Sequence, residues 1–337
     1  MYSITRGVTM TLLLRESHLR EFLTMRDLVP LMEQTLAAFS TGAAVQPLRT
    51  IVPVDAHRGF LAVMPAYLGA QEALALKAVA VYPGNAARGL STHLATILLL
   101  DPENGVLLAV MDGRLITEMR TAAVSAAATR RLARALPVPV VAILGAGVQA
   151  RSHLEALLEV ASPGEIRVWT RTRAGADRYA AEMREQFGAP VRVVASVAEA
   201  VRGAGVVCTV TASETPVLEG RWLAPGTHIN AVGAARPEWR ELDTDTVVRS
   251  RLFVDSRAGA VVEAGDIVAP LRDGAITAAH IQAEIGEVFA GRHPGRTTPE
   301  EITLFKSLGM AVEDVATARF AYLRALARGI GDDLTLE

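Results

Sequence analysis

The second half of the chain alternates short apolar runs with longer segments of mixed polarity. Apolar runs of strand length, bounded by Gly, Pro or charged residues, predict buried strands, and the mixed segments predict helices. Strands that are apolar at almost every position are typical of a parallel sheet covered by helices on both faces. We therefore expect a doubly wound, Rossmann-type α/β domain with strands at 138–144, 166–170, 191–195, 206–211, 228–232 and 252–254 and helices at 149–160 and 177–187.

The first half has shorter strand-like runs separated by turn signals, which predicts a mixed α/β domain rich in sheet. The runs are Leu61–Met64, Leu74–Val81, Leu94–Leu100 and Gly105–Asp112, and the turn signals are Pro83-Gly84-Asn85 and Asp112-Gly113. Near the C-terminus, the polar segment 292–299 predicts a loop or domain crossover. The apolar positions between Leu304 and Phe320 then predict one face of a long helix.

Composition narrows the class of protein. A chain of 337 residues is long enough for two domains, and its net charge of −2 does not suggest a nucleic-acid partner. The near-neutral charge instead predicts a small-molecule partner. The single cysteine, Cys208, lies in an apolar run, so we expect a buried small side chain and no internal disulfide. The apolar stretch Met10–Leu14 ends at Arg15 and is too short for a signal sequence or a membrane span, which predicts a cytoplasmic protein.

The most informative segment is Gly145-Ala146-Gly147-Val148-Gln149-Ala150, which follows an apolar strand and opens a helix. In a Gly-x-Gly-x-x-Ala turn, the first glycine permits the turn and the second lets the backbone approach a pyrophosphate. The helix N-terminus supplies N–H groups and a positive dipole. We expect a dinucleotide site that includes Gly145, Gly147, Val148 and Gln149, although such a turn also joins strands to helices without a ligand.

The end of the next strand bears on the choice of cofactor. An acidic residue there binds the 2′-hydroxyl of NADH, whereas basic residues accommodate the 2′-phosphate of NADPH. This chain has no carboxylate before Asp177 and instead has Thr170, Arg171, Thr172 and Arg173. The segment therefore favours NADPH as the cofactor, with NADH as the alternative. Arg171 and Arg173 could instead be solvated charges of a loop that binds no phosphate.

Four further polar residues adjoin apolar or structured segments of the first half: Arg49, Lys77, His93 and Arg120. A lysine inside an apolar strand needs an anion, so Lys77 indicates a site for a bound anion. In the structural alternative, which applies equally to Arg49 and Arg120, the side chain forms an ion pair or extends its charged end to solvent. His93 begins an apolar strand and is a candidate substrate contact or a structural histidine. The seven histidines show no metal-ligand spacing and no nucleophile motif is visible, so we expect neither a metal nor acyl-enzyme chemistry.

Together these residues resemble the ornithine cyclodeaminase and mu-crystallin family over nearly the whole chain. The motifs are Pro47-x-Arg49, Met64-Pro65, Lys77, Asp112-Gly113 through Thr117 to Arg120-Thr121-Ala122-Ala123, the glycine turn, and Lys306-Ser307-Leu308-Gly309-Met310-Ala311-x-Glu313-Asp314. The resemblance implies a homodimer with substrate between two domains. Residues 1–125 and a C-terminal helix at 303–330 would form the substrate-binding and dimerisation domain, and residues 126–302 the dinucleotide-binding domain.

The resemblance also implies roles for individual residues. Family members hold the α-carboxylate of an amino or imino acid with residues that match Arg49, Lys77 and Arg120, and Lys77 is also a candidate proton donor. His93 and water are the next candidates for that proton. The residues that the resemblance places near the nicotinamide are Thr121, Val232, Gly233, Ser307 and Gly309.

One departure from the family pattern distinguishes among its activities. Cyclodeaminases carry an aspartate shortly after the Asn-Ala-Val-Gly strand, and this chain has Ala235 there, in a segment similar to the mu-crystallin branch of NADPH-dependent ketimine reductases. We therefore expect reduction of Δ1-pyrroline-2-carboxylate or Δ1-piperideine-2-carboxylate to L-proline or L-pipecolate. Ornithine cyclodeamination, amino acid dehydrogenation, N-alkyl amino acid formation and non-catalytic ligand binding remain open.

Overall fold

The computed structural model describes residues 11–335, and the chain divides into two compact units. The first unit contains the chain up to Thr24, Gly42–Thr117 and the chain from Ala311, and the second contains Met25–Thr41 and Glu118–Met310. Helix α3 (Gly113–Leu132) begins in the first unit and ends in the second. This division differs from the expected domain boundaries at residues 25–41, 118–125 and 303–310, all of which belong to the second unit.

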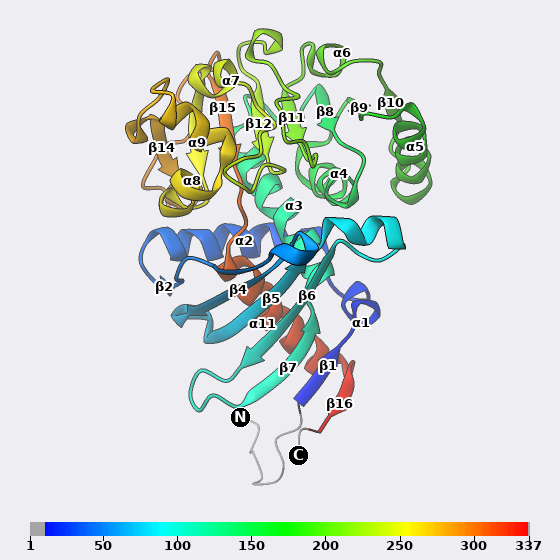
Figure 1. Ribbon diagram of the computed structural model, residues 1–337, viewed down its shortest axis with the longest axis vertical. Coiled ribbons are helices and arrows are strands. Elements are labelled where there is room, and N and C mark those ends of the chain that lie inside the picture. The colour runs from blue at the N-terminus through cyan, green and yellow to red at the C-terminus, as the bar shows by residue number, and fades with distance from the viewer. Residues whose placement is uncertain (1–10, 336–337) are drawn as a thin grey trace. The chain divides into compact units, whose positions relative to one another are not determined.

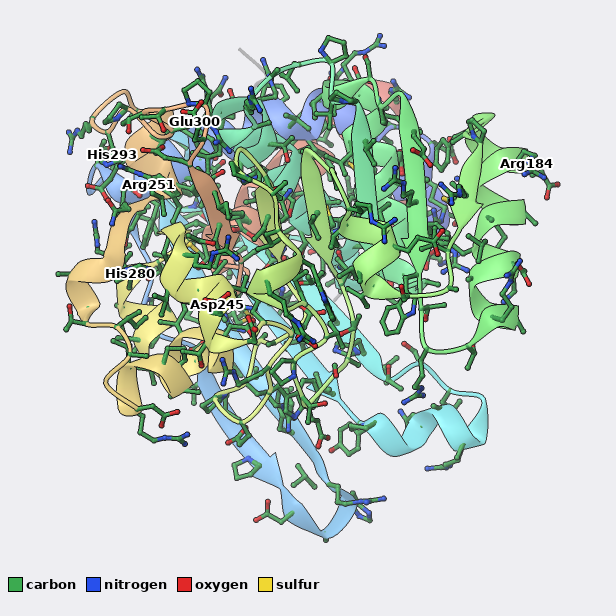
Figure 2. The ribbon with its side chains drawn as sticks, turned by 90° about the horizontal axis from the view of Figure 1, so that it is seen from above. Arg184, Asp245, Arg251, His280, His293 and Glu300 are labelled. Carbon is green, nitrogen blue, oxygen red and sulfur yellow. The ribbon has the colours of Figure 1, made fainter. Side chains whose placement is uncertain are left out.

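The second unit is built on an eight-stranded parallel sheet with strand order β10-β9-β8-β11-β12-β15-β13-β14 (Figure 1). Because the chain runs from β8 outward to β10 and then returns to β11 on the other side of β8, the strand order reverses between β8 and β11. Figure 2 shows Arg184 of α5 on one flank of this unit and Arg251 of β13 on the other. The strands are β8 (Val140–Leu144), β9 (Glu165–Trp169), β10 (Val191–Val193), β11 (Val206–Thr209), β12 (His228–Ala231), β13 (Ser250–Val254), β14 (Ile281–Glu284) and β15 (Ile302–Lys306).

Two apolar cores lie on opposite faces of this sheet, which is the doubly wound arrangement expected from the sequence. On one face Val141 and Ile143 pack with α4 (Val148–Ala161) and α5 (Arg173–Phe187). On the other face Ala142 and Leu144 pack with residues of α6, α7, α8 and α9. These and the remaining helices of the unit are α2 (Met25–Ser40), α6 (Val197–Val201), α7 (Thr244–Arg249), α8 (Arg257–Glu263), α9 (Gly265–Arg272) and α10 (Ile285–Phe289).

The first unit is a largely antiparallel sheet with order β16-β1-β7-β6-β5-β4-β2, to which β3 adds by pairing with β4. Helix α11 (Ala311–Arg328) packs across β4, β5 and β6 (Figure 1). The strands are β1 (Thr11–Leu14), β2 (Ala44–Val45), β3 (Thr50–Val54), β4 (Gly59–Leu68), β5 (Ala73–Val81), β6 (His93–Leu100), β7 (Leu107–Asp112) and β16 (Asp332–Leu334), and the short helix α1 spans Glu16–Arg20.

Two expectations from the sequence were wrong. The long C-terminal helix does not begin near residue 303, because Ile302–Lys306 form β15 in the middle of the parallel sheet and α11 begins only at Ala311. Gly309, with φ of +77°, lies in the turn that separates them. The Asp112-Gly113 signal marks the start of α3, where Asp112 Oδ1 accepts a hydrogen bond from the Leu115 amide at 2.9 Å.

No helix within residues 11–335 is both long enough and apolar enough to cross a membrane. The predicted apolar stretch Met10–Leu14 corresponds to β1, apart from Met10, which lies outside the described residues.

Candidate functional site

The register of the parallel sheet aligns the ends of its strands in one row. The backbone partners run Trp169, Leu144, Thr209, Ala231, Lys306 and Val254 across β9, β8, β11, β12, β15 and β13. We call the residues that immediately follow this row the carboxyl edge. Four residues assigned to the cofactor from the sequence lie there directly: Thr170, Gly145, Val232 and Ser307.

The glycine turn follows β8, where the strand order reverses. Ligands of open α/β sheets bind at such a point, outside the carboxyl ends of the strands. Gly145 has φ of +129°, and a Cβ on it would lie 2.6 Å from the carbonyl oxygen of Val210, so no other residue fits without a backbone shift.

The position of Gly147 fits a bound phosphate. A Cβ on Gly147 would meet no atom within 4 Å, so the space in front of it is open. Gly147 is also the N-cap of α4, whose first amides point beyond the helix. Ala150 is fully buried between that helix and the sheet, as the third small residue of the motif requires. The residues present therefore fit the pyrophosphate of a dinucleotide.

The segment after β9 contains the predicted determinants of cofactor choice. Thr172 caps α5 by accepting a hydrogen bond from the Gly175 amide at 3.3 Å. Arg173 forms an exposed ion pair with Asp177 at 2.9 Å. Arg171 is exposed at the same turn, and no ion pair is described for it within residues 11–335. Of the two arginines, only Arg173 has a described ion pair within residues 11–335.

A buried carboxylate holds the carboxyl edge together between β11 and β12. Glu241 accepts hydrogen bonds from the Thr209 hydroxyl at 2.8 Å, the Thr211 amide at 2.5 Å and the Gly233 amide at 2.7 Å. Gly233 packs so closely that a Cβ on it would overlap the Thr211 carbonyl oxygen. The backbone at Gly233 is therefore fixed by Glu241 on one side and by Thr211 on the other.

Arg120 of α3 reaches the same edge at the turn after β15. It is 4% exposed, and a Cβ on Gly309 would lie 2.5 Å from its Nη1, so glycine leaves the room that the guanidinium occupies. Asp255, which follows β13, accepts hydrogen bonds from the amides of Leu308 at 2.6 Å and Gly309 at 2.8 Å. The structure thus brings a buried guanidinium together with the predicted Ser307–Gly309 turn, and Thr121 is buried next to Arg120 in the sequence.

Lys77 has an anion within its own unit. Its ammonium lies 2.5 Å from Oδ2 of Asp314 on α11, and it donates a hydrogen bond to the Thr117 hydroxyl at 3.3 Å. The side chains of Lys77 and Asp314 are 3% and 1% exposed. The internal ion pair considered from the sequence is therefore present, and the carboxylate keeps the lysine charged.

The remaining predicted substrate residues are less buried. Arg49 is half-buried just before β3, and His93 is exposed at the start of β6, where its ring contacts the Thr92 hydroxyl at 3.2 Å. Ala235 is exposed in the loop after β12. Nothing in the described contacts assigns a ligand to these three residues, so their roles stay predictions.

Sequence reasoning missed the acidic residues that organise the site. Glu241, Asp255, Asp266 and Asp314 are each at most 1% exposed and bind backbone amides or a lysine. The only available signal was their position in otherwise apolar or motif-containing segments, as with Glu313-Asp314 in the quoted C-terminal motif. A carboxylate that binds distant backbone amides leaves no spacing pattern along the chain.

The histidines of the second unit have separate structural contacts. His280 lies 2.9 Å from the Val247 carbonyl oxygen, and the ring of His293 packs edge-on against that of Phe253. Figure 2 labels both histidines. Residues 11–335 contain no group of three or more His, Cys, Asp or Glu residues arranged to hold a metal ion. Cys208 is fully buried, as expected, and burial raises the pKa of its thiol to about 12.

The chain is similar to known proteins over most of its length. Residues 9–329 match the ornithine cyclodeaminase/mu-crystallin family. The chain is 49% identical to ketimine reductase mu-crystallin of Mus musculus over 298 residues, which cover 88% of this chain and 91% of that one. The structure of Thermococcus litoralis Δ1-pyrroline-2-carboxylate reductase in complex with NADH and L-proline superposes with a TM-score of 0.93 at 42% identity, covering 96% of this chain and all of the other.

An archaeal alanine dehydrogenase dimer with bound NAD is also similar, with a TM-score of 0.92 at 33% identity, covering 97% of this chain and all of the other. Because the family match and these relatives each span most of the sequence, the chain belongs to the ornithine cyclodeaminase/mu-crystallin family.

Proposed function

We propose that this protein is a nicotinamide-dependent reductase that transfers a hydride to the C=N carbon of cyclic α-imino acids. Its substrates are Δ1-pyrroline-2-carboxylate and Δ1-piperideine-2-carboxylate, and its products are L-proline and L-pipecolate. The observation that carries this proposal is the glycine turn at the strand-order reversal, with the buried Arg120 on the same edge of the same sheet. The similarity to a ketimine reductase and to a pyrroline-2-carboxylate reductase supports it.

In this proposal, the residues of this chain bind the substrate and align it with the nicotinamide. A bound nicotinamide supplies the hydride, and the imine carbon is already electrophilic, so orientation provides much of the rate enhancement. Arg120 anchors the substrate carboxylate through its planar guanidinium, and Arg49 and Lys77 contribute further positive charge. Lys77, which is charged beside Asp314, is also the proposed donor of a proton to the substrate nitrogen, and it regains a proton from water.

We further propose that NADPH is the preferred cofactor. The turn after β9 has no acidic residue before Asp177, and Arg173 is already paired with that aspartate. Arg171 therefore supplies the positive charge that faces the 2′-phosphate, with the Thr170 hydroxyl beside it. NADH then binds more weakly at the same turn.

We also propose that the protein acts as a homodimer, as the related alanine dehydrogenase does. The face of the antiparallel sheet opposite α11 carries a row of apolar side chains in cross-strand register, namely Val52, Leu61, Ala80 and Leu94. Val52 and Leu94 are 49% and 52% exposed. An apolar sheet face of this kind is typical of a subunit contact.

The direct test follows the absorbance of the reduced cofactor with each of the two imines, using NADPH and NADH in parallel. We expect imine-dependent oxidation with a preference for NADPH. The Arg120→Met variant should raise the KM for the imine at least about tenfold, because a charge-assisted contact is lost, while NADPH still binds. Arg120→Lys keeps the positive charge but lacks the planar guanidinium, so its KM for the imine should lie between those of the wild type and Arg120→Met.

The alternatives give different outcomes in the same assays. Ammonia release from ornithine with NAD⁺, without imine reduction, would make the protein a cyclodeaminase despite Ala235. Oxidation of NADPH only when a 2-oxo acid and an amine are supplied together would indicate N-alkyl amino acid formation, and NAD⁺ reduction with alanine would indicate a dehydrogenase. Tight NADPH binding with no turnover on any of these substrates would favour a ligand-binding protein.

A further inference from the structure

The second unit contains a buried cluster of charges beneath the carboxyl edge, formed by Glu241, Asp266 and Lys306. All three residues are fully buried. Lys306 Nζ lies 3.0 Å from Asp266 Oδ2. Asp266 Oδ1 accepts hydrogen bonds from the amides of Glu241 at 2.8 Å and Leu242 at 2.9 Å. The three residues are therefore linked, although they come from β15, from α9 and from the loop after β12.

The contacts of Glu241 favour a negative charge on the cluster. Every hydrogen bond described for the two carboxylates comes from a donor, either an amide N–H or the Thr209 hydroxyl. Backbone amides can only donate, so the bonds from the Thr211 and Gly233 amides favour the charged form of Glu241. Burial and the nearby charge of Asp266 raise the pKa of Glu241, and the charge of Lys306 and the hydrogen bond from Thr211 oppose this rise. With Glu241 ionised, the two carboxylates and the one ammonium of the cluster carry a net charge of −1.

This negative charge lies at a defined place on the sheet. A dinucleotide bound across the reversal of strand order has its pyrophosphate at the turn after β8 and its adenosine ribose toward β9. Its other end then extends over β11 and β12. Glu241 binds the amides of Thr211 and Gly233, which lie two residues beyond the ends of those two strands. Glu241 therefore contacts the backbone over which the nicotinamide end of a bound cofactor would extend.

The nicotinamide ring changes charge during the proposed reaction. Its reduced form is neutral, and when a hydride leaves with two electrons the ring becomes cationic while the substrate carbon gains the new C–H bond. A fixed negative charge in a poorly solvated site stabilises the cationic ring more than the neutral one. We propose that the Glu241–Asp266–Lys306 cluster lowers the reduction potential of the bound cofactor and so favours hydride donation to the substrate; the inference rests on the proposed function only for the nicotinamide cofactor.

The test measures binding and needs no substrate. The dissociation constants of NADPH and NADP⁺ are determined by calorimetry for the wild-type protein and for Glu241→Gln, which removes one negative charge with little change in shape. We expect NADP⁺ binding to weaken roughly tenfold more than NADPH binding. For a two-electron couple, this factor corresponds to a rise of about 30 mV in the potential of the bound cofactor.

Two further variants separate charge from positioning. Thr209→Val removes one hydrogen bond to Glu241 but keeps the carboxylate, so the ratio of the two dissociation constants should stay close to that of the wild type. Asp266→Asn removes one charge from the cluster without altering the contacts of Glu241 with Thr211 and Gly233, and it should repeat the change in ratio. It also carries the test if Glu241→Gln does not fold.

Equal changes in the dissociation constants of NADPH and NADP⁺, or no change in either constant for Glu241→Gln and Asp266→Asn, would overturn the inference. The cluster would then have only a structural role. Such a result would leave the proposed function intact if the imines are still reduced. Conversely, a selective loss of NADP⁺ affinity in a protein that reduces neither imine would support the inference and refute the substrate assignment.

Discussion

At the scale of single residues, cofactor choice depends on two neighbouring arginines in different surroundings. Arg173 is engaged with Asp177, whereas Arg171 is exposed at the turn after β9. We predict that Arg171→Ala raises the KM for NADPH roughly tenfold, because a charge-assisted hydrogen bond to the phosphate is lost, and leaves the KM for NADH nearly unchanged. Steady-state kinetics with both cofactors measure this. Arg173→Ala is the matched control, and an equal effect of Arg171→Ala on the two cofactors would contradict the assignment.

The buried Lys77–Asp314 pair makes a second residue-level prediction, about stability. Removing one partner leaves the other charge buried and uncompensated, so Lys77→Met and Asp314→Leu should each lower the free energy of unfolding by about 3 kcal/mol. The double variant should be more stable than the sum of the two losses predicts, because both charges are gone. Urea denaturation of the four proteins measures the coupling. Strict additivity would show that the two side chains act independently.

Which of these residues a sequence can identify depends on where their partners lie. Gly145 and Gly147 follow from a local pattern, since the turn, the strand before it and the helix after it are contiguous. The anion that Lys77 requires was also anticipated, but Asp314 is supplied by a helix more than two hundred residues along the chain. Glu241 shows the same limit, because two of the groups that donate hydrogen bonds to it are backbone amides, which every residue except proline offers.

At the scale of elements, the alternation of apolar and mixed segments predicts most of the parallel sheet to within a few residues. The strand β15 was missed because its apolar residues, Leu304 and Phe305, also match a helical spacing with the residues of α11. Only the sheet itself distinguishes the two, because β15 pairs with β12 and β13 on either side. The helix α3 was missed for a related reason. Its many small buried residues give little periodic contrast.

The join between α3 and α4 gives a prediction about pH. His153 of α4 is buried and neutral, its Nδ1–H donating to the Gln149 carbonyl at 2.7 Å and its Nε2 accepting from the Ser125 hydroxyl of α3 at 2.9 Å. Burial lowers its pKa to about 4. An unfolded histidine has a pKa near 6.5, so between these values the unfolded chain binds a proton that the folded one does not.

Stability from this residue is therefore fully present above pH 6.5 and is lost as the pH falls toward 4. We predict that His153→Gln loses less stability than the wild type between pH 7 and pH 5, by about 2 kcal/mol. Urea denaturation of both proteins at the two pH values measures the difference. Other titrating groups, including His228, contribute alike to both proteins and cancel. If the free energy of unfolding changed equally with pH in both proteins, His153 would take up a proton as readily in the folded protein as in the unfolded chain.

At the scale of the whole molecule, the exposed apolar face of the antiparallel sheet is the feature that a single chain leaves unexplained. Its opposite face is covered by α11, with Ala62, Met64 and Ala66 of β4 buried. The strand alternation that buries these residues places Leu61 and its cross-strand neighbours on the other side. The sequence pattern alone cannot distinguish an apolar face covered by a helix of the same chain from one covered by a second subunit.

The dimer proposal therefore predicts that charge on this face separates the subunits. Leu61→Glu combined with Leu94→Glu places two carboxylates in the row shared by β3, β4, β5 and β6, where desolvation on dimer formation would be costly. We expect a monomer by analytical ultracentrifugation at concentrations where the wild type is a dimer. The matched control is Leu323→Glu with Leu326→Glu on α11, residues that are similarly exposed but lie off this face. If the sheet variant stays dimeric, or if the α11 variant dissociates instead, the subunit contact lies elsewhere on the protein.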